Sequence, residues 1–287
     1  MAKAGLGYLG PYRLLKVIHS SQAGKVWQAY HDGQQKRFAI KTLEEKYYRD
    51  KEQLSLLKQE FAVGSKLEHP KIINIHALDN ERGCPYLVME WYPAPNLKSW
   101  VTSALERIAH RTTKIIDQSA EALGYLNSQG WVHRDIKPEN FLVSKEGDVK
   151  LIDFGLAQRS RGGLGRLFAR KSKVQGTRTY MSPEQIRGAA LDIRADVYSF
   201  GCVVHELVNG KPPFTGTSTN ELLNKHLKTP PPALDKLDDN IIPEFAKLVR
   251  RCLAKDPAER PDSVNDFRIQ FRGMRVFRVD PRPPAKA

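Results

Sequence analysis

Hydrophobic residues over positions 11–92 occur in short runs that alternate with polar residues and are separated by turn residues. Runs of this kind predict strands, and we expect five of them, over residues 12–18, 25–30, 37–41, 72–75 and 86–89. Between the third and fourth strands, apolar residues recur at helical spacing and predict a helix over 50–68; this stripe consists of Leu54, Leu57, Phe61 and Leu67. The pattern indicates a small antiparallel sheet with one helix.

From Asn96 onward the hydrophobic spacing becomes that of helices, which we expect over 97–105, 111–129, 196–207, 219–227, 243–253 and 263–271. The helix over 196–207 is apolar on nearly every side, which is typical of a buried helix. We therefore predict an α+β protein with a small β lobe over 11–92 and a larger, mainly helical lobe over 93–272. Residues 1–10 are expected to be a frayed, flexible N-terminus, and the basic, Pro-containing residues 273–287 an extended tail or linker.

A short predicted hairpin interrupts the helical region and carries most of the candidate chemistry. Its two strands flank a Glu-Gly-Asp turn, so that Asn140 and Asp153, just outside the strands, are expected to lie side by side. An amide oxygen and a carboxylate together suit a hard cation such as Mg²⁺. Asp135, in the loop His133-Arg-Asp-Ile-Lys-Pro-Glu-Asn140, is then left to orient a hydroxyl group and accept its proton. A charged turn before a hairpin is the alternative for any one of these residues.

This loop and the later Asp153-Phe-Gly155 resemble the catalytic-loop and metal-binding motifs of the protein kinase family, and the resemblance covers roughly residues 10–272. It implies a bilobal kinase fold and a eukaryotic-like, non-specific serine/threonine protein kinase of the bacterial type. Such an enzyme transfers the γ-phosphoryl group of ATP, with Mg²⁺ or alternatively Mn²⁺, to Ser or Thr hydroxyls of protein substrates. By resemblance, Asp135 positions the acceptor, Lys137 neutralises charge on the γ-phosphate and marks a Ser/Thr kinase, and Asn140 and Asp153 hold the metal.

The same resemblance assigns ATP contacts in the small lobe. Lys41 and Glu60 correspond to the ion pair that holds the lysine on the α- and β-phosphates; in an arbitrary chain both would be read as solvated surface residues. The family has three glycines in the turn after the first strand, where this chain has His19, Ser21 and Gly24, so only Gly24 matches. That departure argues against tight nucleotide binding, but not against the fold.

The resemblance also implies an adenine pocket in which apolar walls and a proline-bearing connector meet. Its members are Ile18, Val26, Ala39 and Leu142 as walls, Met89 at the back, and Glu90 and Tyr92 through their backbone groups. An apolar row of this kind is otherwise ordinary core.

Gly64 lies one helical turn after Glu60, where active kinases usually have a larger apolar residue. Glycine costs roughly 1 kcal/mol in a helix interior, and here it leaves less packing behind Phe154. We therefore expect a mobile helix that is displaced in the absence of ligand, with the pair between Lys41 and Glu60 open.

The activation loop follows Asp153-Phe-Gly155, and regulation by its autophosphorylation is implied by Arg134, which in the family clamps an added phosphate. Ser172 is our first choice for the modified residue, whereas Thr177 resembles the threonine that hydrogen-bonds Asp135 and Lys137. Three further residues are assigned structural roles by resemblance: Glu184 pairs with Arg260, and Asp196 holds the backbone of the catalytic loop. Ordinary surface charges are the alternative for Glu184 and Arg260.

Composition narrows the remaining choices. The net charge of +14 invites a nucleic-acid or membrane-surface interpretation, but the densest basic cluster, Arg159–Lys173, contains only Phe168 as an aromatic, and we expect no specific nucleic-acid partner. The three cysteines are far apart and fit reduced thiols. No apolar run approaches the ~18 residues of a membrane span, so we expect a cytoplasmic protein, or the cytoplasmic domain of a larger membrane protein tethered through flanking sequence.

Two other functions stay open at this stage. The turn that matches only one of the family's three glycines, together with Gly64, favours a pseudokinase scaffold that binds nucleotide without transfer. The Arg159–Lys173 cluster would instead serve a nucleic-acid binder whose affinity falls with salt. Expected partners are protein substrates and, for autophosphorylation, a second copy of the chain.

Overall fold

The computed structural model describes residues 7–160 and 176–283. The chain divides into two compact units. The first comprises the chain up to Pro93 together with Asp153–Gly155, and the second comprises Ala94–Ile152 and the chain from Leu156 onward. The two units are described in turn.

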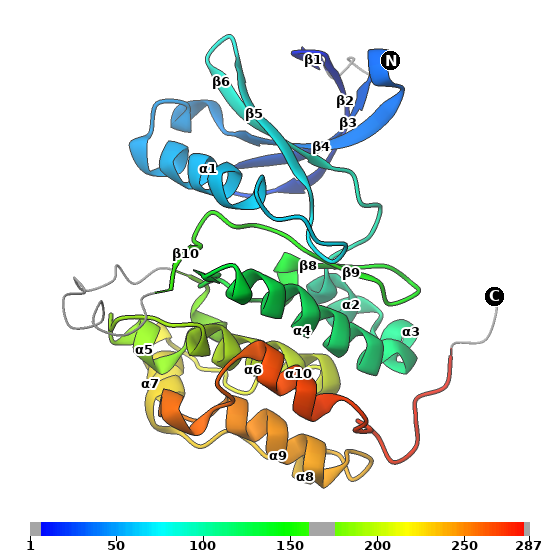
Figure 1. Cartoon of the computed structure of the whole chain (residues 1–287), viewed down its shortest axis with the longest axis vertical. Coiled ribbons are helices and arrows are strands. Elements are labelled where there is room, and N and C mark those ends of the chain that lie inside the picture. Colours follow the sequence, from blue (N-terminus) through cyan, green and yellow to red (C-terminus); the bar gives the residue numbers. More distant parts are fainter. Residues whose placement is uncertain (1–6, 161–175, 284–287) are drawn as a thin grey trace. The chain divides into compact units, whose positions relative to one another are not determined.

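The first unit is built on a six-stranded antiparallel sheet with strand order β1-β2-β3-β4-β6-β5 (Figure 1). The strands are β1 (Tyr8–Leu9), β2 (Tyr12–Ser20), β3 (Gly24–His31), β4 (Lys36–Leu43), β5 (Ile75–Glu81) and β6 (Cys84–Glu90). The sheet therefore has one strand more than the sequence predicts. Gly10 adopts a φ of +55° and lets β1 turn back onto β2, so residues 8 and 9 are not frayed.

One predicted strand of this unit is misplaced. Ile72 and Ile73 are buried, but the strand begins only at Ile75 and continues to Glu81. Apolar side chains that anchor a loop in the core give the same local pattern as a buried strand. The helix α1 runs over Lys51–Gly64, and Asp50 caps its N-terminus with a side chain that accepts a hydrogen bond from the backbone of Gln53.

The second unit is mainly helical (Figure 1). Its helices are α2 (Leu97–Ser103), α3 (Leu105–Ile108), α4 (Thr112–Ser128), α5 (Pro183–Ile186), α6 (Arg194–Asn209), α7 (Thr219–Lys228), α8 (Leu234–Leu237), α9 (Pro243–Cys252) and α10 (Val264–Phe271). Two short antiparallel pairs complete it: β7 (Trp131–Val132) with β10 (Gln158–Arg159), and β8 (Phe141–Val143) with β9 (Val149–Leu151). Every residue of α6 from Ala195 to Leu207 is buried, as its composition predicts.

The segment after Gly273 is not a free linker over its whole length, and that expectation is corrected. Val276 is fully buried, and its carbonyl accepts a hydrogen bond from Ile242 N at 3.0 Å. Arg278 N donates to Asn240 O at 2.7 Å, and Phe277 forms a bridge with Ile241. The segment packs because two apolar side chains and its backbone groups find partners there. No helix among residues 7–160 and 176–283 is long and apolar enough to cross a bilayer.

Candidate active site

The β8–β9 hairpin forms in the predicted place. Phe141 pairs with Leu151, and Val143 pairs with Val149. Just beyond the strands, Ile152 N donates to Asn140 O at 2.9 Å. Asp153 is the next residue in the chain and adopts a φ of +67°, which few non-glycine residues do. Such strained backbone recurs at functional sites.

Both oxygens of the Asp135 carboxylate are bound within the second unit. Lys137 Nζ lies 2.6 Å from Oδ2, while Thr177 donates to Oδ1 from its backbone N at 2.8 Å and from its hydroxyl at 3.0 Å. Lys137 Nζ also reaches Thr177 Oγ1 at 3.1 Å, and Asn140 Nδ2 donates to the Asp135 carbonyl at 2.8 Å. The structure thus brings together the three residues assigned to catalysis in the second unit, and Thr177 makes both contacts that the sequence predicts.

Asp196 lies beneath this loop and accepts three hydrogen bonds, from His133 N at 2.8 Å, Arg134 N at 3.1 Å and Asn127 Nδ2 at 2.9 Å. Burial raises the pKa of Asp196, against the opposing influence of these donors and of His133. Arg134 itself has a φ of +71°, so the loop is held in a conformation that needs outside support. The sequence assigns Asp196 correctly to the loop backbone but gives no signal for Asn127.

Lys41 and Glu60 form an ion pair in the first unit. Their Nζ and Oε2 atoms are 2.6 Å apart, and Asp153 Oδ1 lies 3.7 Å from the same Nζ. Burial by itself would lower the pKa of Lys41, but the carboxylates of Asp153 and Glu60 raise it well above its ordinary value. A fixed positive charge is therefore held between an acid of α1 and the acid of the Asp-Phe-Gly segment. The contact with Asp153 is one that sequence reasoning missed.

The expected displacement of α1 is wrong, because the pair between Lys41 and Glu60 is closed. Gly64 explains why. A Cβ atom built there would lie 2.3 Å from Ile75 Cδ1, 2.9 Å from Ile75 Cγ1 and 3.0 Å from Phe154 Cδ2. The space that a larger residue would occupy is filled from the sheet by Ile75, and Phe154 is fully buried. The glycine therefore leaves no gap behind Phe154.

The turn between β2 and β3 is closed by hydrogen bonds of its own. Ser21 N donates to Gly24 O at 2.9 Å, and Gly24 N donates to Ser21 Oγ at 3.2 Å. A Cβ at Gly24 would lie 2.0 Å from Thr42 O on β4. Close approach of two strands is thus sufficient reason for this glycine, independently of any phosphate. His19 is an exposed residue of β2 and is paired with Val26 on β3.

The residues assigned to adenine are spread over four strands of the first unit and over the second unit. Ala39 on β4 is paired with Met89 on β6, Val26 on β3 is paired with Lys41, and Ile18 on β2 is 42% exposed. Glu90 ends β6 and its carboxylate accepts from Asn74 Nδ2 at 3.0 Å, and Tyr92 follows it. Leu142 belongs to the second unit and bridges to Asn96.

A buried bidentate ion pair joins Glu184 and Arg260. The two guanidinium nitrogens of Arg260 lie 2.7 and 2.9 Å from the carboxylate oxygens of Glu184, and the Arg260 side chain has no exposed surface. Arg260 also donates to the carbonyls of Arg194 and Ala254. All its polar contacts are internal, as befits a buried charge. Ser172 and most of the Arg159–Lys173 cluster lie outside the described residues.

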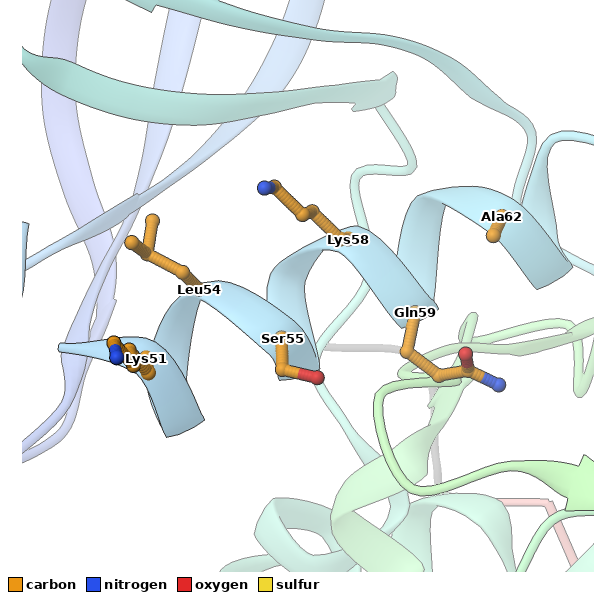
Figure 2. Close-up of a pocket in the computed structure, with 6 residues that line it drawn as sticks. All are labelled: Lys51, Leu54, Ser55, Lys58, Gln59 and Ala62. Atoms are coloured by element: carbon orange, nitrogen blue, oxygen red, sulfur yellow. The ribbon is translucent and has the colours of Figure 1, made fainter. Parts of the chain in front are cut away.

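A hollow of about 440 Å³ lies on the exposed side of α1, lined by Lys51, Leu54, Ser55, Lys58, Gln59 and Ala62 (Figure 2). None of these is among the residues assigned to ATP. The opposite side of α1 carries Glu60 and Gly64, both buried. This hollow is therefore separate from the candidate active site.

The fold and these motifs define a class, and comparison with known proteins agrees with it. The chain belongs to the protein kinase domain family, whose model matches residues 12–268. It is 33% identical over 267 residues to a probable serine/threonine-protein kinase of Streptomyces coelicolor, 32% identical over 286 residues to the serine/threonine-protein kinase PknA of Mycobacterium tuberculosis, and 30% identical over 263 residues to the serine/threonine-protein kinase PrkC of Bacillus subtilis.

These relatives are bacterial Ser/Thr kinases, and they are longer proteins. The three alignments cover 91%, 98% and 92% of this chain but only 39%, 65% and 40% of the relatives. The resemblance seen in the sequence, to a serine/threonine kinase domain of the bacterial type, is therefore confirmed.

Proposed function

We propose that the chain is an active serine/threonine protein kinase that transfers the γ-phosphoryl group of Mg·ATP to Ser or Thr hydroxyls of proteins. The observation that carries the proposal is the network around Asp135. Lys137, Thr177 and Asn140 hold this residue through contacts of 2.6–3.0 Å. A carboxylate held in this way orients an incoming hydroxyl and accepts its proton as the oxygen attacks phosphorus.

The donor set fits a divalent cation. The amide nitrogen of Asn140 is committed to the Asp135 carbonyl, so its amide oxygen is the atom available to a cation. Asp153 supplies a carboxylate, and the side chain of this residue is 40% exposed. Hard oxygen donors of these two kinds suit Mg²⁺ or Mn²⁺. Bound there with ATP, the metal would neutralise charge on the phosphate oxygens.

The cationic side chains complete the proposed reaction. Lys41, held by Glu60, would bind the α- and β-phosphates, and Lys137 would stabilise the negative charge that develops on the γ-phosphoryl group. The proton of the acceptor hydroxyl passes to Asp135, and the bond between the γ-phosphorus and the bridging oxygen breaks. Gly24 and the adenine residues named above would hold the nucleotide.

Regulation by phosphorylation of the activation loop is part of the proposal. Burial lowers the pKa of Arg134, against the influence of Asp196, and this partly buried arginine directly precedes Asp135 in the chain. A phosphate on the segment that carries Ser172 would be a strong partner for such a group. Modification by a second copy of the chain is the expected route. The cytoplasmic location stays a prediction.

Two measurements test the proposal and separate it from a nucleotide-binding scaffold. Saturating Mg·ATP should raise the melting temperature, and the increase should shrink when a chelator removes Mg²⁺ or when Asp153 is replaced by Asn. With labelled ATP and a generic basic protein, phosphoserine or phosphothreonine should form. A melting shift without any label transfer would identify a pseudokinase. If there is neither a melting shift nor label transfer, the proposed ATP site is rejected.

A further inference from the structure

The carbonyl of Arg134 is held from outside the catalytic loop. Its oxygen accepts a hydrogen bond from Gln185 Nε2 at 2.8 Å, although the two residues are 51 positions apart in the chain. Gln185 lies on α5 and is only 3% exposed, so bulk water hardly competes for this bond. Gly176 also comes close to the same oxygen, because a Cβ built on Gly176 would lie 2.9 Å from it. Residues of the segment 176–185 therefore contact one particular peptide group of the catalytic loop.

The orientation of the Gln185 amide follows from its other atom. Oε1 accepts a hydrogen bond from Ser182 N at 3.1 Å and another from Ser182 Oγ at 3.1 Å, as part of the capping box at the start of α5. A backbone N–H can only donate, so the amide atom that faces it has to be the oxygen. The amide NH₂ group then has to face Arg134 O, and the side chain is a fixed donor toward the catalytic loop.

The short helix that carries this donor is itself constrained. Glu184, the residue before Gln185, is bound by both terminal guanidinium nitrogens of the buried Arg260. The carbonyl of Glu184 accepts from Ala189 N at 2.9 Å, and the carbonyl of Gln185 accepts from Gly188 N at 3.0 Å. A donor on such a constrained turn does not follow a carbonyl that moves away, so it holds the Arg134 carbonyl in one place.

The peptide group held by Gln185 leads directly to Asp135. Because a peptide group is planar, the position of the Arg134 oxygen fixes the plane from which the Cα atom and side chain of Asp135 continue. Arg134 has a φ of +71°, a conformation that costs free energy and persists where surrounding contacts impose it. Asp196 binds the backbone N of Arg134 at 3.1 Å, and Gln185 binds its carbonyl. Loss of the second contact would free the half of this strained residue that adjoins Asp135.

We propose that Gln185 is a positioning residue for phosphate transfer, whose amide donor holds the peptide group before Asp135 and so directs the Asp135 carboxylate at the acceptor hydroxyl. Asp196 supports the same loop through backbone N–H groups, whereas Gln185 supports it through a carbonyl. Because Gln185 acts through Asp135, its loss should lower kcat and leave the KM for Mg·ATP unchanged. The inference rests on the proposed kinase function.

Two replacements of Gln185 separate the donor from the helix cap. Gln185→Glu keeps one oxygen for Ser182 and places a second oxygen opposite the Arg134 carbonyl. That oxygen repels the carbonyl when it is ionised and donates to it when it is protonated, and burial favours the protonated form. Gln185→Met has a similar volume and no donor at any pH. The kcat of both variants should be at least about 10-fold below wild type at about pH 8, with the KM for Mg·ATP within about 2-fold.

The pH dependence of kcat should distinguish the two variants. Rates are measured with the whole chain, a generic basic protein as acceptor and saturating Mg·ATP, at a temperature where every protein is folded. Relative to wild type at the same pH, Gln185→Glu should recover by about 10-fold between about pH 8 and pH 6 as its carboxyl group takes up a proton, whereas Gln185→Met should not recover. Titration of Asp135, Glu184 and His226 is common to both variants and cancels in this comparison.

Ser263→Ala controls for a loss of stability alone. The Ser263 hydroxyl caps α10 by accepting a hydrogen bond from Asp266 N at 3.0 Å, and α10 carries no residue of the candidate active site. This variant should therefore lower the melting temperature and leave kcat unchanged.

A kcat of either Gln185 variant within about 2-fold of wild type at pH 8 would overturn the proposal, and so would parallel pH profiles of the two variants. If Gln185→Glu does not fold, the kcat of Gln185→Met decides. A loss that appears only in the KM for Mg·ATP would likewise contradict a role in directing Asp135. Absence of transfer by wild type would instead contradict the proposed kinase function.

Discussion

The packing of Gly64 against Ile75 makes a prediction whose sign can be worked out from the structure. Replacing Gly by Ala inside a helix ordinarily stabilises it by about 1 kcal/mol. At Gly64, however, the new methyl group would lie 2.3 Å from Ile75 Cδ1, where carbon atoms prefer about 3.5–4.0 Å. Overpacking of this kind costs about 1–3 kcal/mol. Gly64→Ala should therefore be neutral to destabilising by about 2 kcal/mol.

Ile75→Val removes the Cδ1 atom that causes the closest overlap and should itself cost about 0.5–1.5 kcal/mol. In that background Gly64→Ala should cost less, so the two substitutions should couple favourably by about 1–2 kcal/mol. The assay is the free energy of unfolding in urea for the four proteins of the cycle. Phosphate transfer measured in parallel should fall with Gly64→Ala and recover in the double variant. The reason is that the added methyl group would displace α1, which carries Glu60.

A matched control lies in α4. Gly124 is a helical glycine too, although it lies inside α4 whereas Gly64 is the last residue of α1, and the nearest atom to a Cβ added at Gly124 is 3.5 Å away, an ordinary contact. Gly124→Ala should therefore gain close to the full ~1 kcal/mol. If Gly64→Ala stabilises the protein as much as Gly124→Ala does, and adds independently to Ile75→Val, the packing argument is refuted.

Three further predictions concern stability. Glu184→Gln should lower the free energy of unfolding by about 3–5 kcal/mol, measured in urea, because it leaves the Arg260 charge buried with half a partner; a loss below 1 kcal/mol would count against a buried pair. Burial, with the nearby Lys255 charge, lowers the pKa of His226 from 6.5 to about 4. As the pH falls, the unfolded chain therefore binds the proton first, and stability should fall by up to about 3 kcal/mol between pH 6.5 and 4. His226→Gln should flatten this dependence in melts at different pH, and an unchanged dependence would contradict the assignment to His226. Truncation after residue 273 should lower the free energy of unfolding by at least about 2 kcal/mol, through loss of Val276 and Phe277, and should lower the melting temperature. Truncation after residue 281 should leave the melting temperature unchanged. Equal melting temperatures for the two truncated proteins would show that the segment does not contribute to stability.

The sequence predicts the elements that have strong local patterns. The hairpin after Asn140, the buried α6 and the amphipathic α1 are all visible as periodicities or turn signals, and the kinase motifs indicate the residues of the candidate site. What it misses are features set by contacts between distant positions. The strand β1 is two residues long and exists only through its pairing with β2, and the packed segment at Val276 has no regular pattern.

The errors in the site have the same origin. From the sequence, Gly64 looks like a defect, because nothing in its neighbourhood reveals that a side chain from β5 fills the space. The contact of Gln185 with the Arg134 carbonyl joins residues 51 positions apart and has no local signature. Gly24 is visible as a motif glycine, but its close approach to Thr42 O is not. Such compensations require side-chain placement in three dimensions.

The central claim is that Asp135 acts on the acceptor hydroxyl and not on nucleotide binding. The most direct measurement is the rate of phosphate transfer by wild type and Asp135→Asn under saturating Mg·ATP, with nucleotide binding to both proteins measured separately. The account predicts that transfer falls by about 10²–10⁴-fold while the affinity for Mg·ATP changes little. Equal transfer by the two proteins would contradict it.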